Sequence, residues 1–354
     1  YQAVHYPHQA PKAFIDKYDG VYDAGWTALR QSRFERQKSL GLIDPDARLD
    51  TEMDKSTLDD WRLPDWDVLS DEEKKFNARR MQSYAGMLDN MDNNIGKLLA
   101  YLEEIGERDS TIIVFLADNG ADPNQLPLNP AYREWYTQHY NYTYLEDYRG
   151  DYSSMGQKGS FADYGPGWAT AANTPNAYYK TYSTEGGVRV PFIVWYPKSI
   201  TGGRHSTAFT YVKDVFATLL DAVDITMPDA TYGDREVYAP DGVSAWPLMT
   251  GERDTVHADE ETVGYELAGS VAMYRGDFKL SRNPSPKGTG AWELYDIIKD
   301  PGETQDLAAQ HPEVVDELAR AYDEYQRKND IVPVPDDYDP IVQLVKNSSH
   351  GATH

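Results

Sequence analysis

The feature that most constrains the fold is a long amphipathic segment that leads directly into an apolar one. Ser70 and Glu73 have the spacing of a capping box, which marks the start of a helix. Apolar residues then recur at intervals of three and four, at Tyr84, Leu88, Met91, Ile95, Leu98, Leu102 and Ile105. Such spacing places them on one helical face, and Gly106 is suited to end the helix. We therefore predict one long amphipathic helix that packs against a core.

Two apolar runs extend this pattern into a sheet. The run TIIVFLADNG at 111–120 is typical of a buried parallel strand that meets its C-terminal loop at Asp-Asn-Gly. The run VPFIVWYP at 190–197 predicts a second buried strand, and the segment 212–222 predicts a helix after it. Because a helix followed by a buried strand is the repeating unit of α/β folds, we expect a large mixed β-sheet sandwiched by helices.

The C-terminal part of the chain has a different texture. Short strand-like runs, ETVGYEL, SVAMYRGDFKLS and WELYDI, precede a helix that opens with Pro312 and carries Val315, Leu318 and Tyr322 on one face. This order predicts a smaller α+β domain of four antiparallel strands and one helix. A chain of 354 residues is too long for one ordinary core, so we divide it into 1–255 and 256–354.

The remaining segments show little periodicity. Residues 1–70 contain one helical stretch, at about 22–40, and resemble peripheral decoration. Residues 121–180 are rich in Tyr, Gly, Asn and Pro and show no sustained period, which predicts a long ordered loop that walls a pocket. The tail from about Asp330 is rich in Pro and Asp and is expected to be extended.

Composition excludes several classes of function. The formal charge of −24 disfavours a nucleic-acid partner, since phosphate backbones are bound by clustered Lys and Arg. No apolar run approaches the length needed to span a bilayer. The chain contains no Cys, which excludes disulfides, thiolate zinc sites and a cysteine nucleophile within these residues. Because the negative field repels anions, any anion site must be locally cationic.

Four side chains could carry chemistry. Asp118 and Asn119 follow the predicted strand and offer two hard oxygen donors suited to Ca²⁺ or Mg²⁺, although Asp-Asn-Gly also makes ordinary turns. Lys180 precedes the flexible segment 185–187 and could hold an oxyanion, although a lysine in such a loop is often only solvated. His5, near a proline, suits general acid or base work, although a surface histidine has the same appearance.

Three segments together resemble the sulfatase family, and within it the bacterial arylsulfatases. The first is 87–122, which ends in TIIVFLADNGAD, and the second is 168–197, which contains NAYYKTYSTEGGVRVPF. The third is 274–313, in which YRGDFKLS and ELYDIIKDPGE form the C-terminal signature of the family. The resemblance runs from HYPHQAP at the start of the chain to about Asp337. It implies an alkaline phosphatase-like fold and the hydrolysis of sulfate esters, from small molecules or carbohydrates.

The resemblance also implies roles for individual residues. In that family a formylglycine, made from Cys or Ser in a Cys/Ser-x-Pro-x-Arg segment, attacks the sulfate sulfur, and a bound Ca²⁺ orients the sulfate, with Mg²⁺ as the alternative. Asp118 and Asn119 correspond to metal ligands, and Asp118 also to a group that helps activate the nucleophile. Lys180 corresponds to a partner of the sulfate oxygens that could assist the leaving group. His5 corresponds to the histidine that contacts the sulfate or the ester oxygen, and Arg189 is expected to brace the turn at 185–187.

This chain departs from the family pattern in one respect. The formylglycine segment and the first pair of metal-binding Asp residues of the family precede the position where this sequence begins, and no Ser-x-Pro-x-Arg occurs in it. We therefore expect an N-terminal segment of the same protein to complete the site. The alternatives are a catalytically inactive sulfatase-like binding protein and a phosphonate or phosphate ester hydrolase of the same superfamily. The compartment stays open, with a periplasmic or secreted location favoured over a cytoplasmic one.

Overall fold

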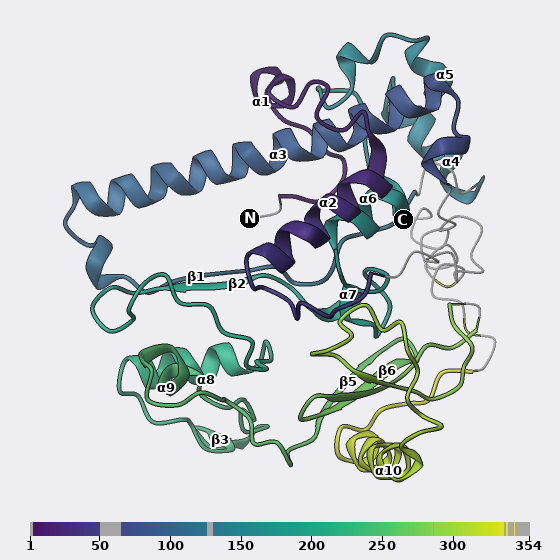
Figure 1. The fold of residues 1–354 in the computed structure, drawn as a ribbon. Coiled ribbons are helices and arrows are strands. Elements are labelled where there is room, and N and C mark those ends of the chain that lie inside the picture. Colours follow the sequence, from purple (N-terminus) through teal and green to yellow (C-terminus); the bar gives the residue numbers. More distant parts are fainter. Residues whose placement is uncertain are drawn as a thin grey trace. The chain divides into compact units, whose positions relative to one another are not determined.

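A computed structural model describes residues 3–49, 65–125, 130–285 and 287–335, together with Tyr338 and Gln343, so most of the predicted C-terminal tail lies outside it (Figure 1). The chain forms two compact units. Unit 1 comprises residues 1–100, 117–190 and 262–354, and unit 2 comprises residues 101–116 and 191–261. Each unit combines segments from both sides of residue 255. The units therefore do not test the division predicted there, which stays a prediction.

The chain begins with helices, continues with helices and short strands in alternation, and ends with four strands and a helix. The helices are α1 (Lys12–Asp16), α2 (Gly25–Ser39), α3 (Asp71–Glu104), α4 (Pro130–His139), α5 (Leu145–Tyr148), α6 (Gly165–Ala172), α7 (Glu185–Val188), α8 (Asp214–Ala222), α9 (Trp246–Thr250) and α10 (Pro312–Lys328). The strands are β1 (Ile113–Leu116), β2 (Phe192–Trp195), β3 (Thr231–Tyr232), β4 (Arg235–Glu236), β5 (Val263–Leu267), β6 (Ser270–Arg275), β7 (Phe278–Arg282) and β8 (Glu293–Asp296). The α/β class is confirmed. None of the described helices is long and apolar enough to cross a membrane.

Helix α3 begins as its capping box predicts. The backbone N–H of Ser70 donates to the Glu73 carboxylate at 2.8 Å, and the N–H of Glu73 donates back to the Ser70 hydroxyl at 3.3 Å. These two bonds satisfy backbone donors that a helix start would otherwise leave unpaired. Local chemistry alone therefore fixes where this helix of 34 residues begins.

The core of unit 1 beneath the N-terminal helices is aromatic. Trp26 of α2, Trp66 and Trp168 of α6 meet with ring centroids 4.6–5.6 Å apart in edge-to-face arrangements. Such edge-to-face pairs add attraction to the area they bury. Helix α2 packs directly on α6 through these residues (Figure 1). The stretch at 22–40 is thus part of a core, and its prediction as peripheral decoration was wrong.

The segment 121–180 is more regular than predicted, since it contains α4, α5 and α6. Helix α6, with the sequence GPGWATAA, is buried at seven of its eight residues. A helix that is buried all round has no polar face and therefore produces no hydrophobic period. The absence of a period, from which a loop was predicted, here results from complete burial.

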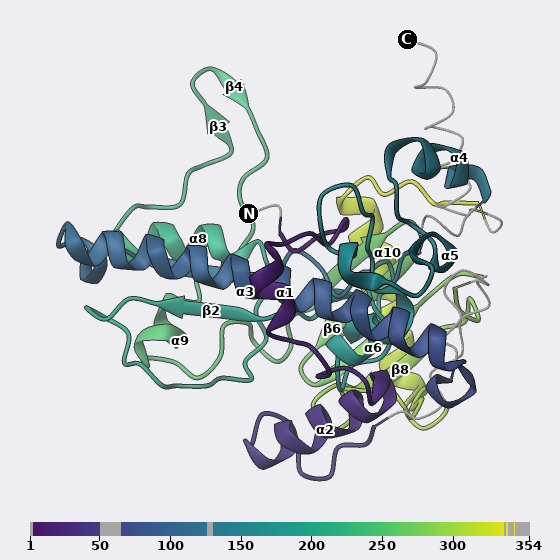
Figure 2. The same cartoon turned by 90° about the horizontal axis from the view of Figure 1, so that it is seen from above.

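In unit 2 the predicted strands pair with each other. Strand β1 pairs antiparallel with β2, with Ile113 opposite Trp195, and its residues are half-buried or exposed, so the prediction of a buried parallel strand was wrong in both respects. In the described residues this sheet has two strands, so both outer edges lack a strand partner, and side chains such as Phe115 and Ile193 are 37% and 58% exposed. Figure 2 shows the β3–β4 hairpin extending away from α8.

The C-terminal part forms the predicted sheet and helix. Strands β5, β6, β7 and β8 follow one another in an antiparallel meander, and α10 packs on β6 and β7 (Figure 1). Their shared core consists of Val271, Met273, Leu280, Leu294, Val314, Leu318 and Tyr322. The strands and one face of α10 supply these side chains, and Leu318 and Tyr322 lie on the helix face that the sequence pattern predicts.

A buried charged cluster joins this sheet to α7. The Lys279 ammonium lies 3.0 Å from a carboxylate oxygen of Glu185 and 3.0 Å from one of Glu303, and its side chain is fully buried. Tyr274 donates to Glu185 at 3.1 Å, and a Glu303 oxygen accepts the backbone N–H of Glu185 at 2.8 Å. Burial opposes ionisation of Glu185, but Lys279 and Arg189 outweigh it and lower its pKa. Burial raises the pKa of Glu303 to about 7, with Lys279 opposing and Glu185 adding to this rise.

We predict that Glu303 makes stability depend on pH. Because its pKa rises from 4.5 to about 7 on folding, the folded protein binds more protons than the unfolded chain in this window. The contribution of Glu303 to the free energy of unfolding is therefore full below pH 4.5 and is lost as the pH rises through about 7. Glu303→Gln, which mimics the protonated acid, should flatten the fall measured by urea unfolding between these values. An unchanged slope would contradict the assignment.

Candidate active site

Two loops of unit 1 meet through their backbones. The N–H of Gly120, in the loop after β1, donates to the carbonyl of Gly187 at 3.0 Å, and the N–H of Lys180 donates to the carbonyl of Ala121 at 3.0 Å. A Cβ at Gly120 would lie 1.7 Å from the Gly186 carbonyl oxygen. A glycine is therefore required here by close approach, and the loop 118–122 lies directly against the loop 177–187.

The amide of Asn173 connects the same loops. Its oxygen accepts the N–H of Ala121 at 3.1 Å, and its nitrogen donates to the carbonyls of Tyr178 at 3.0 Å and Gly186 at 2.8 Å. One side chain thus uses both donors and its acceptor on three separate backbone groups. The relative position of the two loops is fixed by hydrogen bonds to the main chain. The neighbouring side chains are therefore not needed for this connection.

Asp122 brings the predicted Lys180 and His5 together. Lys180 Nζ donates to Asp122 Oδ2 at 3.0 Å, and His5 Nε2 lies 3.8 Å from the same oxygen. Asp122 Oδ1 accepts the N–H of Asn124 at 2.9 Å, which orients the carboxylate. The side chains of Lys180 and Asp122 are 28% and 14% exposed, and that of His5 is 52% exposed. The group is therefore anchored in the protein and open to solvent on one side.

The tautomer of His5 follows from its second contact. Nδ1 lies 3.0 Å from the backbone carbonyl oxygen of Tyr6, and a carbonyl can only accept, so Nδ1 carries a proton. Nε2 is consequently the nitrogen that can gain or lose a proton. It is also the one that faces Asp122.

Asp118 and Asn119 lie in the bend directly after β1, with Asp118 exposed and Asn119 half-buried. In the part of the chain that the structure describes, neither side chain has a hydrogen-bond or ion-pair partner, so their oxygens are not used by the fold. No group of three or more His, Cys, Asp or Glu residues among those described could hold a metal ion. These two residues can supply part of a coordination shell, and a hard cation needs further oxygen donors.

Arg189 has the bracing role predicted for it. The Arg189 guanidinium lies 3.6 Å from the Glu185 carboxylate, and the backbone N–H of Arg189 donates to the backbone carbonyl of Glu185 at 2.8 Å. It therefore acts on the turn at 185–187, whose glycines receive the loop 118–122.

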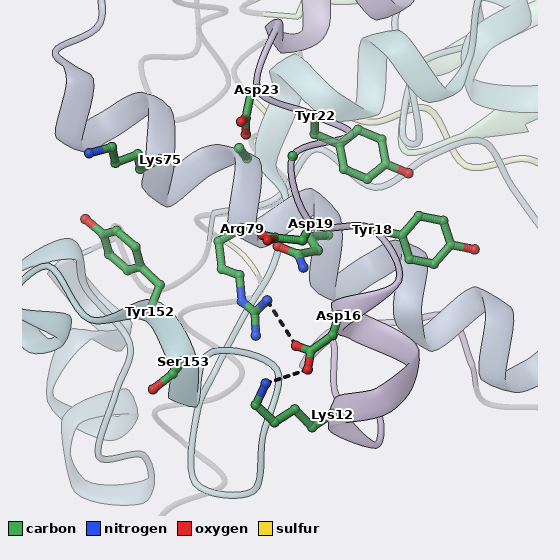
Figure 3. Close-up of a pocket in the computed structure, with 13 residues that line it drawn as sticks. Lys12, Asp16, Tyr18, Asp19, Tyr22, Asp23, Lys75, Arg79, Tyr152 and Ser153 are labelled. Atoms are coloured by element: carbon green, nitrogen blue, oxygen red, sulfur yellow. Dashed lines mark hydrogen bonds and ion pairs between the residues drawn. The ribbon is translucent and has the colours of Figure 1, made fainter.

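A surface cavity of about 610 Å³ lies elsewhere in unit 1, between α1 and the start of α3. Figure 3 shows Arg79 at its centre, facing Asp16, which also binds Lys12. The lining contains none of the four predicted site residues. Two of its cationic side chains, Lys12 and Arg79, pair with the same carboxylate of Asp16.

Sequence reasoning missed Asp122 and Asn173. Asp122 belongs to the segment ADNGAD that carried the resemblance, and its position beside a turn was the available signal. Asn173 precedes Thr-Pro in a segment predicted to be a loop, and nothing local distinguishes it from a turn residue.

Comparison with known families gives two matches. Residues 1–225 match the family model described as Sulfatase, and residues 176–328 match the model described as N-sulphoglucosamine sulphohydrolase, C-terminal. Together they cover all four predicted site residues, the buried cluster of Lys279 and the three segments that resemble the sulfatase family.

Similar proteins are known from several organisms. A sulfatase of Schizosaccharomyces pombe, described as uncharacterized, is 36% identical over 96% of this chain and 58% of its own length. An arylsulfatase of Klebsiella aerogenes is 35% identical over 69% of this chain and 49% of its own length. A solved structure of a protein in complex with its substrate, D-glucosamine-2-N,6-O-disulfate, aligns with a TM-score of 0.47 and 24% identity over 77% of this chain and 45% of that one. The chain thus spans about half the length of these proteins.

We predict that Gly120→Ala disrupts the contact between the two loops. The new Cβ would meet the Gly186 carbonyl at 1.7 Å, so the backbone must move, at a cost of about 1–3 kcal/mol of unfolding free energy or more. Gly96→Ala is the matched control, because nothing lies within 4 Å of its Cβ position in α3. That change should be neutral or stabilising, by up to about 1 kcal/mol. Equal effects in urea unfolding would show that the contact at Gly120 is not tight.

Proposed function

Because this chain belongs to the sulfatase family, we propose that the protein that carries it hydrolyses sulfate esters at the site built around Asp122. The observation that supports this most is the convergence of a lysine and a histidine on one carboxylate, in the loop that also carries Asp118 and Asn119. The lysine gives the local positive charge that an anionic ester needs in a chain of charge −24.

Lys180 is proposed to hold a sulfate oxygen. An ammonium has three donors, and Asp122 accepts one of them at 3.0 Å. The remaining donors can bind the sulfate while Asp122 keeps the side chain in place. A held cation stabilises charge that develops on the sulfate and on the leaving oxygen, and it needs no reorganisation during the reaction.

His5 is proposed to act at the ester oxygen. With Nδ1 committed to the Tyr6 carbonyl, Nε2 is the ring atom that can exchange a proton with the departing alcohol, and it faces the Asp122 carboxylate at 3.8 Å. Asp122 therefore contacts both of the proposed partners of the substrate.

Asp118 and Asn119 are proposed to bind Ca²⁺, with Mg²⁺ as the alternative. Their oxygens after β1 have the hard character that these ions prefer. The bound ion would act as a Lewis acid on the sulfate. Ca²⁺ takes about 6–8 oxygen ligands, so the other ligands would come from an N-terminal segment of the same protein and from the substrate.

The same segment is proposed to carry the formylglycine nucleophile. A hydrated formylglycine supplies the attacking hydroxyl in the family that this chain belongs to. We propose that Asp118 helps to remove the proton of that hydroxyl. We propose a small-molecule or carbohydrate sulfate ester as the substrate and a periplasmic or secreted location.

The proposal predicts a substrate preference and a role for Lys180. The full-length protein should hydrolyse nitrophenyl sulfate with a higher kcat/KM than nitrophenyl phosphate. Lys180→Ala should lower kcat/KM for the sulfate by about 10²–10³-fold, as loss of one oxyanion donor does in other hydrolases. Lys299→Met, which removes an exposed lysine paired with Asp296, should leave the rate unchanged. A preference for the phosphate would instead assign the protein to phosphoryl chemistry.

Metal removal provides a second test. Chelation by EGTA or EDTA should abolish turnover, and added Ca²⁺ should restore it. Asp118→Ala should raise the Ca²⁺ concentration needed for half-maximal activity by at least about tenfold, because it removes a charged ligand. Calorimetric titration of Ca²⁺ into the metal-free protein would check this without an activity assay. Equal Ca²⁺ affinity in the two proteins would exclude Asp118 as a ligand.

A further inference from the structure

The loop that carries Lys180 is held in an unfavourable backbone conformation. Thr181 has φ of 79° and Tyr178 has φ of 55°, both in the left-handed region that residues other than glycine rarely adopt. For a β-branched residue such as Thr this is a real outlier, and such strain persists only where the surroundings enforce it. The Thr181 hydroxyl is buried and has no hydrogen-bond partner among the described residues, so it does not enforce the conformation.

Lys287 binds the carbonyl of this strained residue. This lysine follows β7, is 4% exposed, and donates from Nζ to the Thr181 carbonyl at 3.0 Å and to the Ser270 hydroxyl at 2.9 Å. Ser270 is the first residue of β6 and is fully buried, so the sheet fixes one end of this connection. Asn283 adds a second connection, because its oxygen accepts the N–H of Ser183 at 3.0 Å.

The backbone around Lys180 is consequently bonded at two consecutive residues, Lys180 and Thr181. Its own N–H donates to the Ala121 carbonyl at 3.0 Å, and the carbonyl of the next residue accepts the Lys287 ammonium. A buried ammonium is costly unless it is fully bonded, and a charged donor forms a stronger bond to a carbonyl than a neutral one does. Lys287 therefore has the properties of a strong clamp on a strained peptide.

We propose that Lys287 is a positioning residue for Lys180, so that the C-terminal sheet determines the sulfate-binding geometry through the Thr181 carbonyl. This inference rests on the function proposed above for Lys180. It assigns no contact with substrate to Lys287, and its effect on catalysis passes entirely through Lys180.

A double-mutant cycle on the full-length protein tests this dependence. Lys287→Met should lower kcat/KM for nitrophenyl sulfate by about 10–100-fold, since small displacements of a catalytic group have costs of this order. In a Lys180→Ala background the same change should have less than about a twofold further effect, because nothing is left to position. Lys287→Arg should restore part of the activity. If the two losses multiply instead, Lys287 does not act through Lys180 and the proposal is overturned.

Hydrogen exchange separates this proposal from the proposed function. Lys287→Met should speed the exchange of the Lys180 and Ser183 amides, which donate to Ala121 and Asn283, while the amides of α10 keep wild-type rates. If Lys287→Met does not fold, Ser270→Ala can be measured instead. It removes only one acceptor of Lys287 Nζ and should show the same change to a smaller extent. Unchanged exchange at Lys180 would overturn the clamp whatever the activity. Faster exchange in a protein without sulfate ester turnover would support the clamp and reject the proposed function.

Discussion

The contact of Gly120 with Gly186 and Gly187 is the constraint on which the site depends. It is made between main chains, with a Cβ position only 1.7 Å from the opposite carbonyl, so no side chain can be inserted and neither loop can shift alone. The loop after β1 carries Asp118, Asn119 and Asp122, and the opposite loop carries Lys180. Because backbone groups and Asn173 make the connection, it does not depend on the side chains of Asp118, Asn119 and Lys180.

Lysines in this acidic chain have divided roles. Lys279 and Lys287 are buried and bonded to carboxylates, a carbonyl and a hydroxyl, so their charges are used within the protein. Lys180 has one carboxylate partner and is 28% exposed, so its charge stays available to an anion. In a chain of charge −24, attraction of any anion depends on such local charge, because the field of the whole molecule opposes it. The Asp122 carboxylate weakens the attraction of Lys180 for an anion, and it also orients the Lys180 ammonium.

Local patterns predicted the elements whose chemistry is local. The capping box of Ser70 and Glu73 predicted the start of α3, and the short strand-like runs from 261 to 297 predicted the C-terminal sheet, because each signal acts within a few residues. Helix α6 was not predicted, because a helix that is buried on all sides shows no hydrophobic period in its sequence. Asp122 was missed because Lys180 is 58 residues away, and only the contact of the two loops makes the carboxylate a common partner. The four predicted site residues stay predictions, although the structure places His5 and Lys180 at one carboxylate.

The C-terminal sheet is better understood as the frame of the site than as a separate module. Lys279 of the GDFKL run and Glu303 of the DPGE run both bind Glu185, which opens the glycine turn that receives Gly120. Asn283 and Lys287, from the connection after β7, bind the residues that follow Lys180. Residues far along the chain therefore support both sides of the loop 177–187. This explains physically why 262–354 and 117–190 fall within one compact unit, and why the C-terminal signature accompanies the residues proposed to bind sulfate.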